Sequence, residues 1–126
     1  MKDLGNEYGN HIIDFDELGC RDVSQSFLKV IYQMFIDETA SQLELLEQAI
    51  VDSNVSMAEM CGHTIKGTAS NIGATNLGVI AFRVEQAAID NNIDFVTRHI
   101  PELKHEFARV HVLLEQIFPS SNISRK

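Results

Sequence analysis

The chain contains little of several residue types that mark other classes of protein. Its 126 residues include only two cysteines, two prolines and no tryptophan. Cys20 and Cys61 are too few and too far apart for a disulfide framework or a CxxC motif, so we expect a reducing, cytoplasmic setting. No charged segment followed by an apolar run opens the chain, which predicts no secretion signal. No apolar run reaches the roughly 20 residues that a membrane span needs, so we expect no membrane insertion.

Positive charge is also scarce. Ten Lys and Arg stand against 18 Asp and Glu, a formal net charge of −8. This argues against a nucleic-acid binder, because phosphate backbones are bound by clustered Lys and Arg. Acidic residues are in turn absent from Met60 to Phe82, where Lys66 is the only formally charged residue. Because charge depletion is typical of the core of an interface, this segment is a candidate docking surface.

What the chain has instead is helical periodicity. Apolar residues recur at helical spacing, which predicts helices over about 23–52 and 57–71. A third helix is expected to be capped by Thr75 or Asn76 and to end at about 89, and a long last helix carries the stripe from Ile100 to Ile117. No segment alternates apolar and polar residues as a strand would. The fold class is therefore all-α: an antiparallel four-helix bundle with an additional short N-terminal helix or arm. We expect an arm at 1–15, the bundle at 16–118 and a tail at 119–126.

Local signals place the ends of these helices. Capping-box patterns, Asp22 with Gln25 and Ser56 with Glu59, predict the starts of the first two helices. Gly73 is placed to cap the C-terminus of the second. Pro101 is expected in the first turn of the last helix or at a kink, because proline is unfavourable inside a helix.

One stretch, HTIKGTASNIGAT at residues 63–75, departs from an ordinary helix sequence. On a helical wheel, Ala58, Cys61 and Ile65 mark the core face, and His63 and Lys66 lie opposite, together with Gly67 and Ser70. Glycine inside a helix costs about 1 kcal/mol relative to alanine, and an exposed face offers no packing reason for Gly67. Its missing side chain leaves the imidazole of His63 uncovered and allows another protein to approach.

The chemistry that suits such a histidine is limited. No Ser or Cys nucleophile and no triad carboxylate accompany His63 in the sequence, but imidazole is itself a nucleophile. The ammonium of Lys66 would favour a phosphoryl group with its added negative charge. An uncovered histidine, an open approach and a neighbouring cation together indicate a phosphorylation site that is presented to a partner.

The stretch resembles the motif of histidine-containing phosphotransfer (HPt) domains, roughly H-x-[LI]-K-G-x-[AS]-x-x-x-G-[AL]. His63, Ile65, Lys66, Gly67, Ala69, Gly73 and Ala74 match it, and the resemblance covers about residues 15–118. It implies a four-helix bundle in which His63 is phosphorylated at Nε2 and passes phosphoryl groups between receiver-domain aspartates of a multistep phosphorelay.

The resemblance also implies roles for other residues and for partners. Lys66 would stabilise the phosphoryl group and Gly67 would make room for the receiver. A polar residue of the following helix often bonds the other ring nitrogen. Glu85 matches that position best, with Gln86 beside it. Receiver domains and a hybrid sensor histidine kinase are the expected partners of a monomer that has no cofactor of its own. Mg²⁺ and the acidic residues for transfer are expected on the receiver.

Alternatives stay open at this stage. Ser70 is either a contact of the phosphoryl group or a small residue tolerated at an interface. The chain lacks a Gly-rich nucleotide loop, so it is expected to be a phosphoryl carrier and not an ATP-dependent kinase. A non-phosphorylated helical adaptor would use the same face without the chemistry. His99, His105 and His111 recur six residues apart, which does not fit zinc ligands on one helix face, and no metal site is expected.

Overall fold

A computed structural model describes residues 25–118 of the chain. Within them lie four helices: α3 (Gln25–Val51), α4 (Val55–Asn71), α5 (Thr75–Ile89) and α6 (Ile93–Ile117). The described range contains no strand. The expected N-terminal arm or short helix, the capping residue Asp22 and the C-terminal tail lie outside the described residues.

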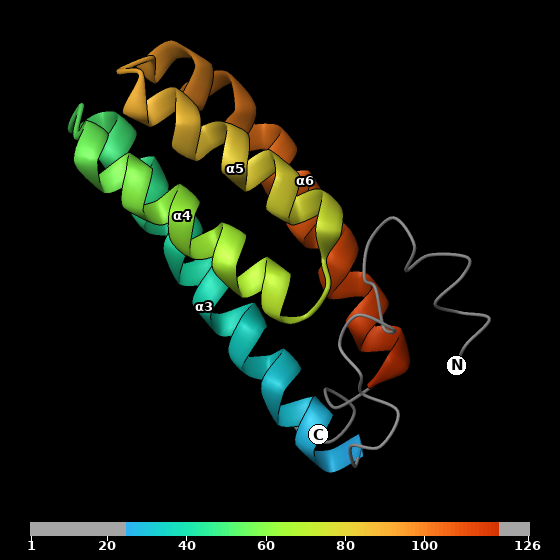
Figure 1. The fold of residues 1–126 in the computed structure, drawn as a ribbon. Helices are drawn as coiled ribbons and strands as arrows, with labels where there is room; N and C mark the ends of the chain where they lie inside the picture. The colour runs from blue at the N-terminus through green and yellow to red at the C-terminus, as the bar shows by residue number, and fades with distance from the viewer. Residues whose placement is uncertain (1–24, 119–126) are drawn as a thin grey trace.

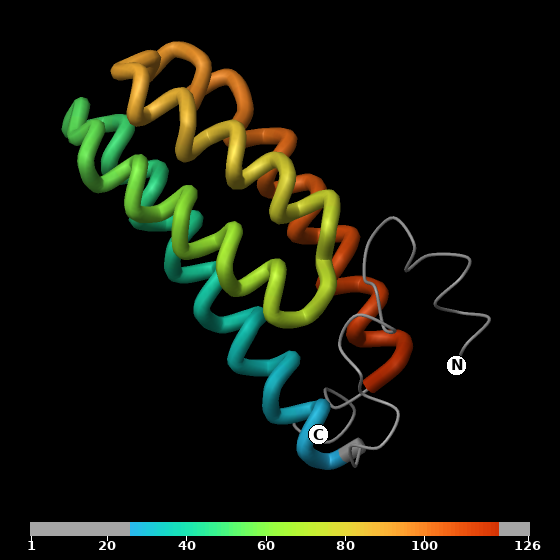
Figure 2. The backbone as a smooth tube through the Cα atoms, viewed as in Figure 1, coloured from blue at the N-terminus to red at the C-terminus, as the bar shows by residue number. Residues whose placement is uncertain are grey.

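The four helices form an antiparallel bundle (Figures 1 and 2). Short turns join consecutive helices, so each helix runs against the one before it. The closest association is between the two short helices, α4 and α5, while α3 packs on α4 and α6 packs on α5. The long helices α3 and α6 extend past the turn that joins α4 and α5 (Figure 1). This architecture confirms the expected all-α fold class.

The core consists of the apolar faces that the periodicity predicts. Buried side chains come from all four helices, with Leu46, Ile65, Leu77 and Leu103 almost completely inaccessible to solvent. Aromatic rings join α3 to α6: Phe35 meets Phe107 edge to face, at 6.0 Å between ring centroids. Burying a large apolar side chain contributes about 1.5–3 kcal/mol, so this core holds the helix faces in a fixed orientation.

Helix α4 ends in a turn that contains the predicted glycine cap, Gly73. Gly73 has a φ of 72°, a left-handed conformation that glycine adopts without strain. The amides of Gly73 and Ala74 bond the carbonyls of Ser70 and Ala69, which is the Schellman arrangement. The predicted glycine cap of α4 is confirmed.

The predicted N-terminal caps were wrong in two places. Helix α4 begins at Val55, and its cap is Asn54, whose side chain accepts a hydrogen bond from the amide of Met57. Ser56, the predicted cap, lies inside the helix, because Asn54 already occupies the position that bonds the first free amides. Helix α5 begins at Thr75 after Ala74, with no side-chain cap.

Pro101 was expected in the first turn of its helix or at a kink. Helix α6 begins earlier, at Ile93, where the side chain of Asn92 accepts from the amide of Phe95. Pro101 therefore lies in the helix interior, and its placement in the first turn was wrong. The backbone amide of Asn92 also donates a hydrogen bond to the carbonyl of Ala87, which closes the turn after α5. Asn92 thus both closes the turn after α5 and caps α6. The apolar stripe alone does not indicate this start of the helix.

Candidate functional site

His63 lies in the middle of α4 on the face turned away from the core. Its side chain is 67% exposed, whereas Cys61, Ile65 and Ala69 on the same helix are buried. The orientation predicted from the helical wheel is therefore confirmed. An imidazole in this position is open to a molecule approaching from solvent.

Two side chains converge beside His63 from α4 and α5. Nδ1 of His63 lies 2.9 Å from Oε2 of Glu85, and Nζ of Lys66 lies 3.1 Å from Oε1 of the same carboxylate. The Glu85 side chain is only 10% exposed. A single buried carboxylate thus pairs with both the histidine and the lysine, with one oxygen for each.

The distance between the two helices at this point is set by Gly62. A Cβ atom at Gly62 would lie 2.9 Å from the backbone nitrogen of Glu85 and 3.1 Å from the carbonyl oxygen of Ala81. Real Cβ atoms do not approach backbone this closely, so any other residue would push α5 away. Because Gly62 immediately precedes His63, the close approach of the two helices is what brings Glu85 within hydrogen-bond distance of the imidazole.

The charge state of Glu85 follows from its surroundings. Burial by itself would raise the pKa of this carboxyl, but hydrogen bonds and charge from Lys66 and His63 outweigh burial and leave the pKa below its usual value. Glu85 is thus ionised at neutral pH and can only accept hydrogen bonds. The shared proton therefore belongs to Nδ1 of His63, and in the neutral imidazole Nε2 keeps its lone pair.

The ammonium of Lys66 has a second neighbour on α5. It lies 5.2 Å from the centroid of the Phe82 ring, within the range of a cation–π contact. Phe82 is 45% exposed, and Met60, one turn before His63 on α4, is 63% exposed. Exposed apolar side chains therefore adjoin the His63 site on both helices.

The remaining predicted site residues lie nearby with different surroundings. Gly67 is exposed, and a Cβ atom there would meet nothing within 4 Å, so the bundle itself does not require a glycine at this position. Ser70 is exposed one turn further along α4. Of the two candidates on α5, Glu85 accepts the hydrogen bond from His63, while its neighbour Gln86 is exposed.

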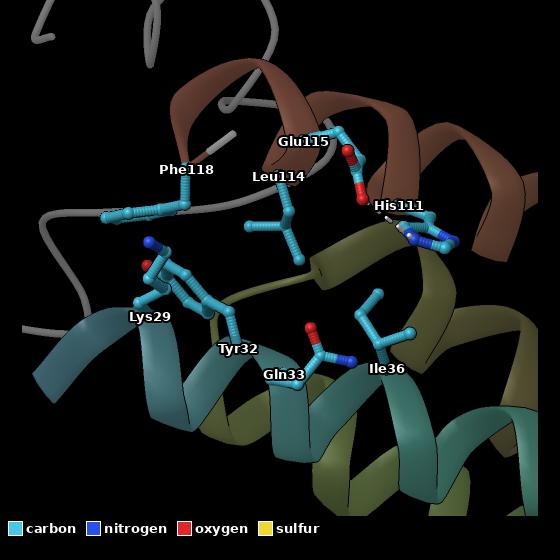
Figure 3. A pocket seen from close by; sticks show the side chains of 8 residues that line it. All are labelled: Lys29, Tyr32, Gln33, Ile36, His111, Leu114, Glu115 and Phe118. Atoms are coloured by element: carbon cyan, nitrogen blue, oxygen red, sulfur yellow. Dashed lines mark ion pairs between the residues drawn. The ribbon is translucent and has the colours of Figure 1, made fainter. Parts of the chain in front are cut away.

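The histidines of α6 are separate from this site. The ring of His99 stacks on Phe95 at 3.9 Å between centroids. His111 lines a small pocket between α3 and α6 and lies 3.6 Å from Glu115 (Figure 3). In residues 25–118 no three His, Cys, Asp or Glu side chains come together in a way that could hold a metal ion. None of the four described helices is long and apolar enough to cross a membrane.

Comparison with known proteins agrees with this geometry. A family model for the Hpt domain matches residues 30–112. The chain belongs to the Hpt domain family. The match confirms the resemblance to the histidine-containing phosphotransfer domains of two-component phosphorelays, and it spans all of α4 and α5.

The Hpt fold is also found by structural comparison. The crystal structure of histidine-containing phosphotransfer protein B (HptB) from Pseudomonas aeruginosa PAO1 superimposes with a TM-score of 0.78 at 24% identity. The match covers 84% of this chain and 92% of the other. At this identity the likeness supports the fold. No curated protein matches the sequence.

Sequence reasoning missed two residues of this Hpt site. Gly62 received no role in the sequence analysis, although its position directly before His63 on the buried side of α4 was a signal of close helix packing. Phe82 was named only as the end of the acid-free segment, with no relation to Lys66. Its relation to Lys66 depends on the register between α4 and α5, which no periodicity within one helix can reveal.

Proposed function

We propose that this chain is a histidine phosphotransfer protein that accepts a phosphoryl group on Nε2 of His63 and passes it between receiver-domain aspartates. The observation that carries the proposal is the bond from Nδ1 of His63 to the ionised carboxylate of Glu85. This bond fixes the tautomer in which the free lone pair lies on Nε2. The imidazole is then a nucleophile that needs no general base, since Nε2 carries no proton to remove.

The chemical step follows from that arrangement. The Nε2 lone pair of His63 attacks the phosphorus of an aspartyl phosphate on the receiver. The N–P bond forms as the acyl O–P bond breaks, and the aspartate leaves as a carboxylate. The ring gains positive charge while it carries the phosphoryl group, and Glu85 offsets that charge at Nδ1. Transfer to the next receiver is the same step in reverse.

Lys66 and Gly67 act on the side where the phosphoryl group arrives. Lys66 lies one turn beyond His63, with its ammonium beside the site, and would attract the incoming negative charge. Gly67 leaves open space one turn from the imidazole, so the receiver can bring its aspartyl phosphate close. Ser70 lies further along the same exposed face and is proposed as a docking contact.

The partner is proposed to be a response-regulator receiver domain, with a hybrid sensor histidine kinase as the upstream source of phosphoryl groups. The stretch from Met60 to Phe82 contains no acidic residue, so it would not repel the acidic pocket of a receiver. Mg²⁺ is expected to be held by the receiver during transfer. Exposed Met60 and Phe82 would supply apolar contact area around His63.

The test is transfer of radiolabelled phosphoryl from a phosphorylated receiver to the purified protein, followed by treatment of the product with acid and with base. Acid-labile, base-stable label on the wild type and none on His63→Gln supports transfer through His63. His111→Gln, which changes a histidine outside the site, serves as the matched control and should accept label normally. Receiver binding with no label on the wild type would contradict the proposal and favour an adaptor that acts without phosphorylation.

A further inference from the structure

The cation–π contact between Lys66 and Phe82 is not required by the phosphotransfer step proposed for His63. Antiparallel packing pairs the two helices in register: His63 faces Glu85, and Lys66, three residues later on α4, faces Phe82, three residues earlier on α5. Residues three apart lie on the same side of a helix. The four side chains therefore form two adjacent rows across the α4–α5 contact.

Within this group of four side chains, the Lys66 ammonium has two different neighbours. Oε1 of Glu85 lies 3.1 Å away on one side, and the Phe82 ring centroid lies 5.2 Å away on another. The Lys66 side chain is 35% exposed, so without neighbours its flexible stem could swing into solvent. The carboxylate and the ring face together hold the ammonium against α5.

A phosphoryl group on His63 would change only one of these two contacts. It would bring about −1.5 to −2 of charge next to the site and compete with Glu85 for the ammonium of Lys66. The Phe82 ring is uncharged, and its negative face attracts the cation whichever anion the ammonium pairs with. The ring can thus keep Lys66 beside His63 while its anionic partner changes.

We infer that Phe82 is a positioning residue, which holds the Lys66 ammonium beside the phosphoryl group of phosphorylated His63. This inference rests on the proposed function. Phe82 acts through Lys66 and does not touch the reacting atoms. Exposed cation–π contacts are worth enough to change a population or a rate by about two- to fivefold. Phe82→Leu keeps an apolar side chain but removes the ring face, and should shorten the lifetime of the phosphohistidine by that factor.

The experiment uses phosphoramidate, a small phosphoryl donor, so no receiver takes part. The N–P bond of the donor breaks as ammonia leaves, and the new N–P bond forms on His63. Hydrolysis of the label is then followed at neutral pH. Phe82→Leu should lose it about two to five times faster than the wild type, and Phe82→Tyr, which keeps the ring face, should restore the lifetime. Phe27→Leu, the same change at an exposed position near the start of α3, should leave the lifetime unchanged.

A double-mutant cycle separates action through Lys66 from any other effect. In the Lys66→Met background, Phe82→Leu should produce no further shortening. An equal shortening in both backgrounds would overturn the inference, as would a wild-type lifetime in the single variant.

The contact itself has a readout that does not depend on phosphorylation. Ring current from Phe82 should shift the Lys66 ε-methylene proton resonances upfield in the free protein, and Phe82→Leu should abolish that shift. Absence of the shift in the wild type would overturn the inference even if His63 is phosphorylated normally. A normal shift with no label on His63 would instead refute the proposed function, and with it the role of Phe82.

Discussion

Two histidine–glutamate pairs among residues 25–118 differ in the distance between the partners, in their exposure and in the helices that they join. His63 and Glu85 join two helices at 2.9 Å, and the glutamate side chain is 10% exposed. His111 and Glu115 lie one turn apart on α6, at 3.6 Å, with both side chains more than 40% exposed. An exposed pair of the second kind contributes roughly 0–1 kcal/mol and is weakened by salt.

The difference lies in what holds the carboxylate. Glu85 is fixed by burial against α4 and by an ion pair with Lys66, so it can set the tautomer of His63. Glu115 lies at an exposed position on the same helix as its histidine, and water can replace either partner. The same two residue types therefore give a positioned nucleophile in one place and a surface ion pair in the other.

The largest expected effect is the difference in phosphotransfer rate between variants that lack one or the other glutamate. Glu85→Ala should slow phosphotransfer to His63 by about 10- to 100-fold, because a hydrogen bond to a charged group is worth about 1.5–3 kcal/mol. Glu115→Ala should leave the rate within twofold of the wild type. Single-turnover transfer from a phosphorylated receiver measures both, with circular dichroism as the check on folding. Equal rates for the two variants would mean that burial of the carboxylate is irrelevant to transfer.

The two glycines near His63, Gly62 and Gly67, should respond in opposite ways to replacement by alanine. Gly62→Ala should lower the free energy of unfolding by about 1–3 kcal/mol, as overpacking does, and should slow transfer because α5 must move away with Glu85. Gly67→Ala should raise the free energy of unfolding by up to about 1 kcal/mol. Urea denaturation measures both changes.

A bulky side chain at Gly67 tests the space left for the receiver. Gly67→Leu should slow transfer from a receiver while the helix stays as stable as in the wild type or becomes more stable. If transfer is unaffected by Gly67→Leu, or if Gly62→Ala is tolerated as well as Gly67→Ala, the assigned roles of these glycines are wrong.

The smallest expected effect concerns acid stability, where two buried carboxyls should act with opposite signs. The folded-state pKa of Glu85 is lowered overall, although burial opposes the shift. Its contribution to stability is therefore present above its ordinary pKa, near 4.5, and is lost as the pH falls through the lower folded value. Burial raises the pKa of Glu106 despite its pairing with Arg109, so the folded state gains stability from Glu106 as the pH falls.

Urea denaturation from pH 7 down to pH 3 checks these signs. Glu85→Gln should make the loss of stability below about pH 5 less steep. Glu106→Gln should make the loss steeper, because it removes a group that favours the folded state in acid. The same change of slope in both variants would contradict the opposite pKa directions.

The sequence was sufficient to predict what depends on a single helix. Periodicity and the small residues around His63 gave the fold class, the exposed face of α4 and the Gly73 cap, because each depends on neighbours within one or two turns. The motif led to Glu85 through resemblance to the HPt family.

Relations between helices could not be predicted in this way. The contact of Gly62 with the backbone of Glu85 and the placement of Lys66 over Phe82 depend on the register of α4 against α5. The N-terminal cap of α4 was misplaced, and the start of α6 at Ile93 was not predicted, for a related reason. Asn54 and Asn92 each belong to a tight turn whose geometry is fixed by the preceding helix as well as the following one.

The central claim is that the hydrogen bond which Nδ1 of His63 donates to Glu85 directs phosphorylation to Nε2 of His63. The most direct measurement is a ¹⁵N NMR spectrum of the imidazole nitrogens before and after phosphorylation with phosphoramidate. We predict a proton on Nδ1 in the free protein and coupling of ³¹P to Nε2 of His63 in the phosphorylated one. A proton on Nε2 in the free protein, or coupling of phosphorus to Nδ1 or to another histidine, would contradict it.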